Sequence, residues 1–178
     1  MIGRRSQLSS GFTLLELLVV IGIIGLLASI VLVATNQSRE KSRNAAKLAQ
    51  LEQMIKVIHI HHAETGEYPL TGTGVNGALR CLGSYPGDSC WNNGGTGRAV
   101  NAAFEAYFVP EYFREMPPLD TILVNDHYGA IYRSTLSGQG YQIFYYLQGD
   151  FDDVNCQLPN ATKQNIGGFA RCLITVTS

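Results

Sequence analysis

Proline is missing from the first 68 residues of this 178-residue chain, and all six prolines lie at Pro69 or beyond it. Proline breaks the interior of a helix, so its absence allows one helix to run through the whole stretch. The first strong stop signal is Gly66, which can take the left-handed conformation of a helix end, and Pro69 follows it. The sequence therefore predicts a single helix that begins near Phe12 and ends at Thr65.

A surplus of either charge is also missing. The chain has 13 lysines and arginines against 14 aspartates and glutamates, which gives a formal net charge of −1 at pH 7. Domains that bind nucleic acid usually carry a clear basic surplus. The basic residues beyond the predicted helix are scattered along the sequence: Arg80, Arg98, Arg114, Arg133, Lys163 and Arg171. The charge pattern therefore argues against a nucleic-acid partner.

Patterns typical of an enzyme active site are missing as well. No serine, cysteine or histidine arrangement indicates a nucleophile, and there is no glycine-rich phosphate loop. His59, His61 and His62 cluster near the predicted helix end. A zinc site needs three or four converging ligands, and no paired cysteine or carboxylate stands at a fixed spacing from these histidines. We expect no catalysis and interpret the histidines as polar residues at a helix terminus, where the dipole favours protonated imidazole.

What the sequence does have is a long apolar run at residues 11–34, interrupted by one acid, Glu16. About 20 apolar residues suffice for a helix to cross a bilayer. A carboxylate near the centre of such a helix costs on the order of 3 kcal/mol. Glu16 lies near the start of the run, where its side chain can reach the headgroups. Residues 12–34 therefore predict a membrane helix in which Glu16 is either a tolerated interfacial acid or a functional one.

The residues around Glu16 form a specific pattern. Arg4 and Arg5 come first, then a polar stretch, and then Gly11-Phe12-Thr13-Leu14-Leu15-Glu16 directly ahead of the rest of the apolar run. This arrangement resembles the class III signal of bacterial type IV pilins and type II secretion pseudopilins. The resemblance implies that residues 1–11 are a leader, which prepilin peptidase removes after Gly11. It further implies methylation of the new Phe12 amine, and pairing of Glu16 with that amine on a neighbouring subunit.

The fold that the resemblance implies is α+β, with a long N-terminal helix packed on a small antiparallel sheet. Residues 12–34 would form the transmembrane and filament-core half of the helix, and residues 35–65 its amphipathic continuation. Apolar residues of that continuation recur at helical spacings and mark one face: Leu48, Leu51, Met54, Ile55, Val57 and Ile58. Residues 66–178 would form a globular head with an αβ-loop and a C-terminal antiparallel sheet.

Composition predicts the elements of this head. Residues 70–97 are rich in glycine, serine, asparagine and threonine, which is typical of a long loop. Residues 98–113 predict a helical segment with Val100, Phe104 and Phe108 on one side. Residues 128–133, 141–147 and 171–177 are rich in aromatic and β-branched residues, which predicts three strands. The polar and acidic residues 148–168 predict a loop between the last two strands.

Four cysteines allow three pairings, and the sequence alone does not select one. Proximity along the chain favours Cys81 with Cys90 and Cys156 with Cys172. The second bridge would close a loop of about 15 residues, worth about 3 kcal/mol in the chain-entropy model. Disulfides are rare in the cytosol, so they fit a head that lies outside it.

The predicted acidic loop raises the question of a cation. Asp150, Asp152, Asp153 and Asn155 offer alternating oxygen ligands of the kind that calcium uses, and some major pseudopilins bind calcium in a C-terminal loop. The spacing is not that of an EF-hand. We interpret the segment as a solvated acidic loop, with calcium binding as the alternative, and we expect no other cofactor.

The resemblance implies a structural subunit of a type IV pilus-like filament, a polymer of pilin subunits joined through their N-terminal helices. An assembly platform protein and a cytoplasmic ATPase would drive polymerisation. The subunit would cross the cytoplasmic membrane once with its head outside, and later stand in an extracellular or periplasmic filament. The cations that follow the apolar run favour the opposite topology: Arg39, Lys41, Arg43 and Lys47. Two alternatives share the signal, namely a type II secretion pseudopilin of a periplasmic piston, and a minor pilin or anchored binding module for adhesion or DNA uptake.

Overall fold

The computed structural model describes residues 12–73, 75–85, 89–91, 98–119, 124 and 126–177. The chain divides into two compact units, Met1–Arg39 and Glu40–Ser178. In chain order the elements are α1 (Leu14–Thr65), β1 (Arg80–Cys81), β2 (Ser89–Cys90), β3 (Arg98–Ala99), α2 (Ala102–Glu105), β4 (Ala130–Thr135), the 3-10 turn η2 (Leu136–Gly138), β5 (Gly140–Asp150), β6 (Ala161–Ile166) and β7 (Phe169–Thr177).

Helix α1 has 52 residues, which confirms the prediction of one long N-terminal helix. Its end follows the predicted signal. Gly66 has a φ of 83°, and its amide donates to the carbonyl of His62 at 2.8 Å. Two residues later the amide of Tyr68 donates to the carbonyl of Gly138 at 2.8 Å, so the chain leaves the helix directly toward η2. A left-handed residue at this point satisfies a carbonyl of the last turn and stops the helix.

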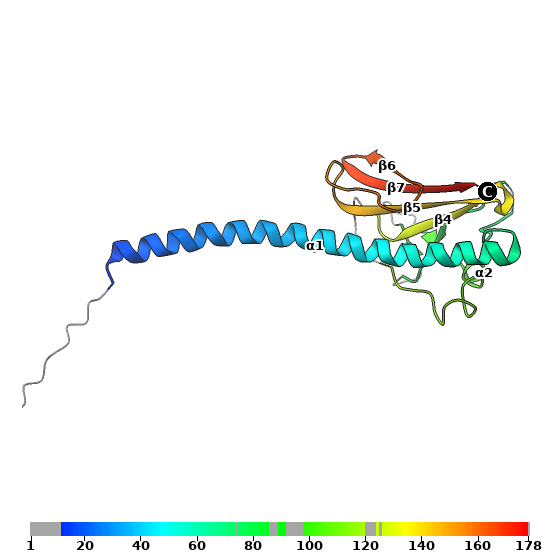
Figure 1. The fold of residues 1–178 in the computed structure, drawn as a ribbon, viewed down its shortest axis with the longest axis horizontal. Helices are drawn as coiled ribbons and strands as arrows, with labels where there is room; N and C mark the ends of the chain where they lie inside the picture. The colour runs from blue at the N-terminus through cyan, green and yellow to red at the C-terminus, as the bar shows by residue number, and fades with distance from the viewer. Residues whose placement is uncertain are drawn as a thin grey trace, which may run out of the picture. The chain divides into compact units, whose positions relative to one another are not determined.

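A five-stranded antiparallel sheet is the centre of the second unit, and its order is β1-β4-β5-β7-β6. Figure 1 shows β4, β5, β7 and β6 side by side, with the cyan and green part of α1 running beneath them. Strands β2 and β3 form a separate two-stranded sheet. The structure therefore confirms an α+β fold, with a long N-terminal helix and an antiparallel sheet, an arrangement like that of type IV pilins.

The core of the second unit forms where α1 meets the sheet. Leu51, Met54 and Ile58 are fully buried, as the helical spacing predicts, and they belong to one cluster with Tyr132 and Tyr141 of the sheet. Burying a side chain of this size contributes about 1.5–3 kcal/mol relative to leaving it exposed. The second unit therefore depends on the packing half of α1 for its core.

One prediction about the head was wrong, and a second was right only in part. Residues 161–166 form strand β6, although the sequence predicts a loop there. Residues 98–113 contain only one short helix, α2, between β3 and a series of turns. Asn101 caps α2 by accepting a hydrogen bond from the amide of Phe104 at 2.9 Å. Pro110 disfavours helical geometry at Val109, so one helix cannot continue through to residue 113.

Candidate functional site

The N-terminal end of α1 is built around Thr13 and Glu16. The amide of Glu16 donates to Oγ1 of Thr13 at 3.2 Å, and the Thr13 hydroxyl lies 3.5 Å from Oε2 of Glu16 as a donor. A threonine followed three residues later by a glutamate is the sequence signature of a capping box. This capping-box signature was present in the sequence but was not identified from it. A carboxylate in the first turn also complements the positive end of the helix dipole.

Phe12 precedes this cap with 82% of its surface exposed. Gly11 and the rest of the expected leader lie outside the described residues. The structure thus places Phe12 two residues before the start of α1 and Glu16 in its first turn, with the Glu16 carboxylate next to the Thr13 hydroxyl. Among the described residues the one ion pair is between Lys56 and Glu52, so Glu16 has no cationic partner within this part of its own chain.

The surface that follows Glu16 is apolar and uncovered. Large apolar side chains are exposed all around this part of the helix: Leu17, Leu18, Val19, Val20, Ile21, Ile23, Ile24, Leu26, Leu27, Ile30, Val31 and Leu32. Within the described residues, α1 is the one helix long and apolar enough to cross a membrane. Ser29 donates its hydroxyl to the carbonyl of Leu26 at 2.8 Å. Its polar group is thus satisfied inside the helix, as a lipid environment requires.

Gly22 and Gly25 interrupt this apolar surface. A Cβ atom at either position would meet nothing within 4 Å, so neither glycine is required by a contact within the described chain. Small residues in membrane helices allow two backbones to approach closely.

Both cysteine pairs are bonded in the structure. Cys81 joins Cys90, and Cys156 joins Cys172, with Cα–Cα distances of 5.7 Å in each case. These are the two bridges that proximity along the chain favours, and no cysteine is left free. The first bridge links the two sheets of the head through β1 and β2. The second attaches the loop after β5 to the centre of β7.

The loop after β5 is also held by Lys163 of β6. Its ammonium group donates to the carbonyls of Phe151 at 2.8 Å and Val154 at 2.9 Å, and it lies 4.3 Å from the centre of the Phe151 ring. A cation from the chain itself therefore binds the carbonyl oxygens of this acidic segment. Within the described part of the chain, no three histidine, cysteine or acidic side chains are grouped to hold a metal ion.

The histidines at the end of α1 contact tyrosines. Nε2 of His59 lies 3.1 Å from the hydroxyl of Tyr141, and the ring of His62 stacks on Tyr68 with centroids 4.1 Å apart. His61 packs edge-on against Tyr107. Burial lowers the pKa of His59, and the neighbouring His62 lowers it further. These contacts fit the interpretation of the cluster as a structural helix terminus. The expectation of protonated imidazole was wrong for His59 and His61, because burial lowers the pKa of both.

The family comparison points to the N-terminal segment. The family model "Prokaryotic N-terminal methylation motif" matches residues 7–32, which include Gly11, Phe12, Glu16 and most of the apolar run. Searches of curated proteins and of solved structures found no match to this chain. Residues 7–32 therefore carry the prokaryotic N-terminal methylation motif, the signal of type IV pilins and pseudopilins.

Proposed function

We propose that this chain is a structural subunit of a type IV pilus-like filament, processed by prepilin peptidase and polymerised through its N-terminal helix. The methylation motif at residues 7–32 carries the proposal. Proteins with this signal are cleaved ahead of the apolar segment, so the segment stays attached as an anchor. The exposed apolar surface of α1 supports this role, since it needs either lipid or neighbouring helices to cover it.

The proposal gives Glu16 a defined task. After cleavage behind Gly11, Phe12 has a free amine at the start of α1, one turn before the Glu16 carboxylate. In the filament, the carboxylate of one subunit pairs with the Phe12 amine of the next, so two opposite charges neutralise each other within an apolar bundle. Removal of one partner leaves a buried charge, which costs about 3–5 kcal/mol. Assembly therefore depends on both groups.

Replacement of Glu16 by alanine tests the proposal. We expect Glu16→Ala to lower the amount of filament sheared from the cell surface at least about 100-fold, as a loss of about 3 kcal/mol implies. Glu40→Ala is the matched control, because Glu40 is an exposed acid of the same helix outside the apolar run. Normal filament levels in the Glu16 variant would contradict the proposal. A second variant, Gly11→Val, should accumulate as the uncleaved precursor on an immunoblot.

The disulfides favour a pilus over a secretion pseudopilus. A bridge that closes the C-terminal loop, here between Cys156 and Cys172, is common in type IV pilins. The proposed location is the cytoplasmic membrane, crossed once with the head outside, followed by an extracellular filament. Electron microscopy of surface-sheared material distinguishes the two cases. Long surface filaments that contain this chain support the pilus, whereas a secretion defect without such filaments supports the pseudopilus.

A further inference from the structure

The outer face of the sheet carries a small cluster of cations around one aromatic ring. Tyr141 of β5 contacts His59 of α1, so its side chain points toward the helix. Phe144 lies three positions later in the strand, and its side chain therefore points to the opposite face. The guanidinium carbons of Arg133 and Arg171 lie 5.9 and 5.8 Å from the centre of the Phe144 ring. The three residues come from β4, β5 and β7, which the sheet places side by side. We call them the arginine–phenylalanine patch.

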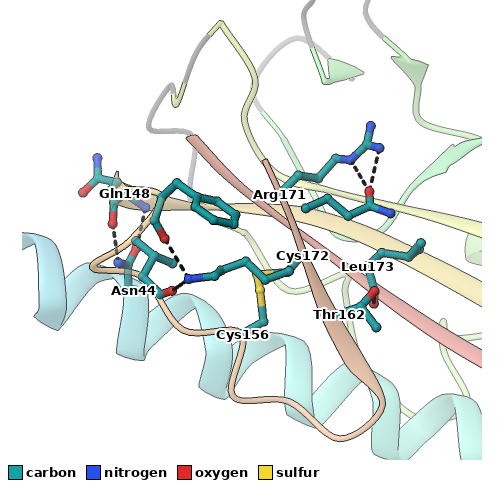
Figure 2. Close-up of a disulfide and its surroundings, with 11 residues drawn as sticks. Asn44, Gln148, Cys156, Thr162, Arg171, Cys172 and Leu173 are labelled. Atoms are coloured by element: carbon teal, nitrogen blue, oxygen red, sulfur yellow. Dashed lines mark hydrogen bonds between the residues drawn. A yellow bond between two sulfur atoms is a disulfide. The ribbon is translucent and has the colours of Figure 1, made fainter. Parts of the chain in front are cut away.

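Neutral side chains hold both guanidinium groups. Arg133 donates through Nη2 to Oε1 of Gln142. Arg171, which Figure 2 labels, donates to Oε1 of Gln164 through Nε at 3.0 Å and Nη2 at 2.7 Å. Among the described residues, neither arginine has a carboxylate within 4.0 Å. Two positive charges are therefore oriented on one ring without an anion to neutralise them. Such a surface favours a partner that supplies carboxylates or phosphates.

The same head carries acidic groups without a cationic partner. The side chains of Asp150, Asp152 and Asp153 are exposed, and none forms an ion pair within the described chain. They lie at the end of β5 and in the loop behind it, which Lys163 and the Cys156–Cys172 bridge hold in place. Residues 150–153 thus present three negative charges on a segment that is fixed at both ends.

The arginine–phenylalanine patch and the loop that carries Asp152 and Asp153 are attached to opposite faces of the sheet. Asp150 pairs with Phe169 and therefore lies on the face of Arg171. Gln164 pairs with Arg171 in the β6–β7 ladder, and Lys163 pairs with Cys172, so these two pairs point to opposite faces. Figure 2 shows Arg171 on one side of β7 and Cys156 on the other. Because Cys156 and Lys163 bind the acidic loop, this loop is attached to the face away from the arginines. Asp152 and Asp153 are therefore separated by the sheet from the arginines of their own chain, so a second copy can supply these acids to the patch.

We propose that the arginine–phenylalanine patch of one subunit binds residues 150–153 of a second copy of this chain, as a lateral contact between heads in the filament. This inference rests on the proposed function. A patch that binds a different patch of the next copy is a heterologous contact, which continues from subunit to subunit without closing. A single exposed ion pair contributes little. The contact is repeated at every subunit, so the small free energies of the individual ion pairs add up along the filament. The glutamines already hold the guanidinium groups in place, which reduces the entropy lost when each pair forms.

A charge-reversal cycle in the assembling cell tests the contact with the full chain. We expect Arg133→Glu with Arg171→Glu to lower sheared filament at least about five-fold, and Asp152→Arg with Asp153→Arg to do the same. The chain with all four changes should return to within about two-fold of the unmodified level, because the charges are then exchanged rather than removed. Arg98→Glu with Arg114→Glu is the matched control, since both side chains are exposed and the change in net charge is the same.

The outcomes separate this contact from its alternatives. Unchanged filament in either reversed pair, or no recovery in the chain with four changes, overturns the inference. The neutral pair Arg133→Gln with Arg171→Gln guards against misfolding and should give an intermediate loss. If the reversed arginines abolish binding of a fluorescent single-stranded oligonucleotide to the detergent-solubilised chain but leave filament unchanged, the partner is a soluble polyanion. Glu16→Ala is measured in parallel, because its loss of filament supports the proposed function even where the charge cycle fails.

Discussion

A single asparagine joins α1 to the sheet at the point where the ladder is interrupted. The pairing of β5 with β7 shifts register between Tyr146 and Asp150, and Gly149 has a φ of 113° there. Asn44 supplies the missing partners (Figure 2). Its Nδ2 donates to the carbonyl of Gln148 at 2.8 Å, and its Oδ1 accepts from the amide of Gln148 at 2.9 Å. The side-chain amide thus replaces one residue of a neighbouring strand, and it satisfies backbone groups that a bulge leaves unpaired.

We predict that Asn44→Ala lowers the free energy of unfolding of the head by about 2 kcal/mol, since two partly buried backbone groups lose their partner. Thermal unfolding of the detergent-solubilised chain, followed by near-ultraviolet circular dichroism of the tyrosines, measures the change. Gln53→Ala is the control, because Gln53 is exposed on the same helix. Equal midpoints for the two variants would show that the Asn44 contact does not stabilise the head.

Lys163 leads to a prediction about calcium. Its ammonium group binds the carbonyl oxygens of Phe151 and Val154, and oxygens of this kind are ligands that calcium also uses. We predict that EGTA leaves the melting temperature of the unmodified chain unchanged. Lys163→Met should lower the free energy of unfolding by about 1–2 kcal/mol, because two charge-assisted hydrogen bonds are lost. Lys56→Met is the exposed control, and a melting temperature that EGTA lowers would instead indicate a bound cation.

At the scale of elements, the sequence predicts those parts whose pattern is local. The absence of proline and the apolar spacing of Leu51, Met54 and Ile58 are enough for α1. Aromatic and β-branched residues are enough for β4, β5 and β7. Strand β6 has the sequence Ala-Thr-Lys-Gln-Asn-Ile, with exposed side chains at three of its positions, and nothing in it alternates between apolar and polar. Residues 161–166 form a strand because β7 pairs with them, and local strand propensity does not reveal this pairing.

The candidate sites also divide into one that a local pattern predicts and one that depends on strand pairing. The Thr13–Glu16 cap depends on a spacing of three residues, so the sequence contains it in full. Arg133 and Arg171 are distant in the sequence and were interpreted as scattered. They meet at Phe144 only because β4, β5 and β7 are neighbours in a particular register. Register is a property of the whole sheet, and that is why the arginine–phenylalanine patch could not be predicted.

The two disulfides should stabilise the head unequally. Cys156 and Cys172 are separated by 16 residues, and Cys81 and Cys90 by 9. In the chain-entropy model, loss of the longer bridge costs about 3 kcal/mol and loss of the shorter one about 2.6 kcal/mol. We predict that serine at both positions of the longer bridge lowers the midpoint of urea unfolding more than serine at both positions of the shorter one. Four reactive thiols in the denatured, unreduced chain would contradict both bridges.

At the scale of the whole molecule, the two units differ in how they satisfy their apolar residues. The second unit buries them in a core of its own, whereas those of residues 12–32 are exposed. An uncovered apolar surface of this extent in water leads to aggregation. The first unit therefore depends on its surroundings for stability, first on lipid and then, under the proposed function, on neighbouring helices. The second unit has its own core, so its free energy of unfolding should depend on the composition of the surrounding water and not on whether lipid or helices cover the first unit.

That response should include pH, through the histidines at the end of α1. Burial is the main reason that the pKa of His59 and the pKa of His61 lie below the ordinary value of 6.5. His62 lowers the pKa of both, and Glu64 partly opposes the effect at His61. His59 also packs against Tyr68 and Tyr141, whose rings restrict access of water. The folded head therefore favours neutral imidazoles.

We predict that the head loses stability as the pH falls below about 6.5, because the unfolded chain then binds more protons than the folded one. The contribution of neutral imidazole is fully present above that value, decreases as the pH falls toward the lowered pKa of the folded state, and is absent below it. Melting temperatures measured between about pH 7.5 and about pH 5 should fall in the unmodified chain. His59→Asn with His61→Gln should fall less over the same range, since neither replacement titrates. An equal fall in both chains would assign the acid sensitivity to other groups and contradict a role for this cluster.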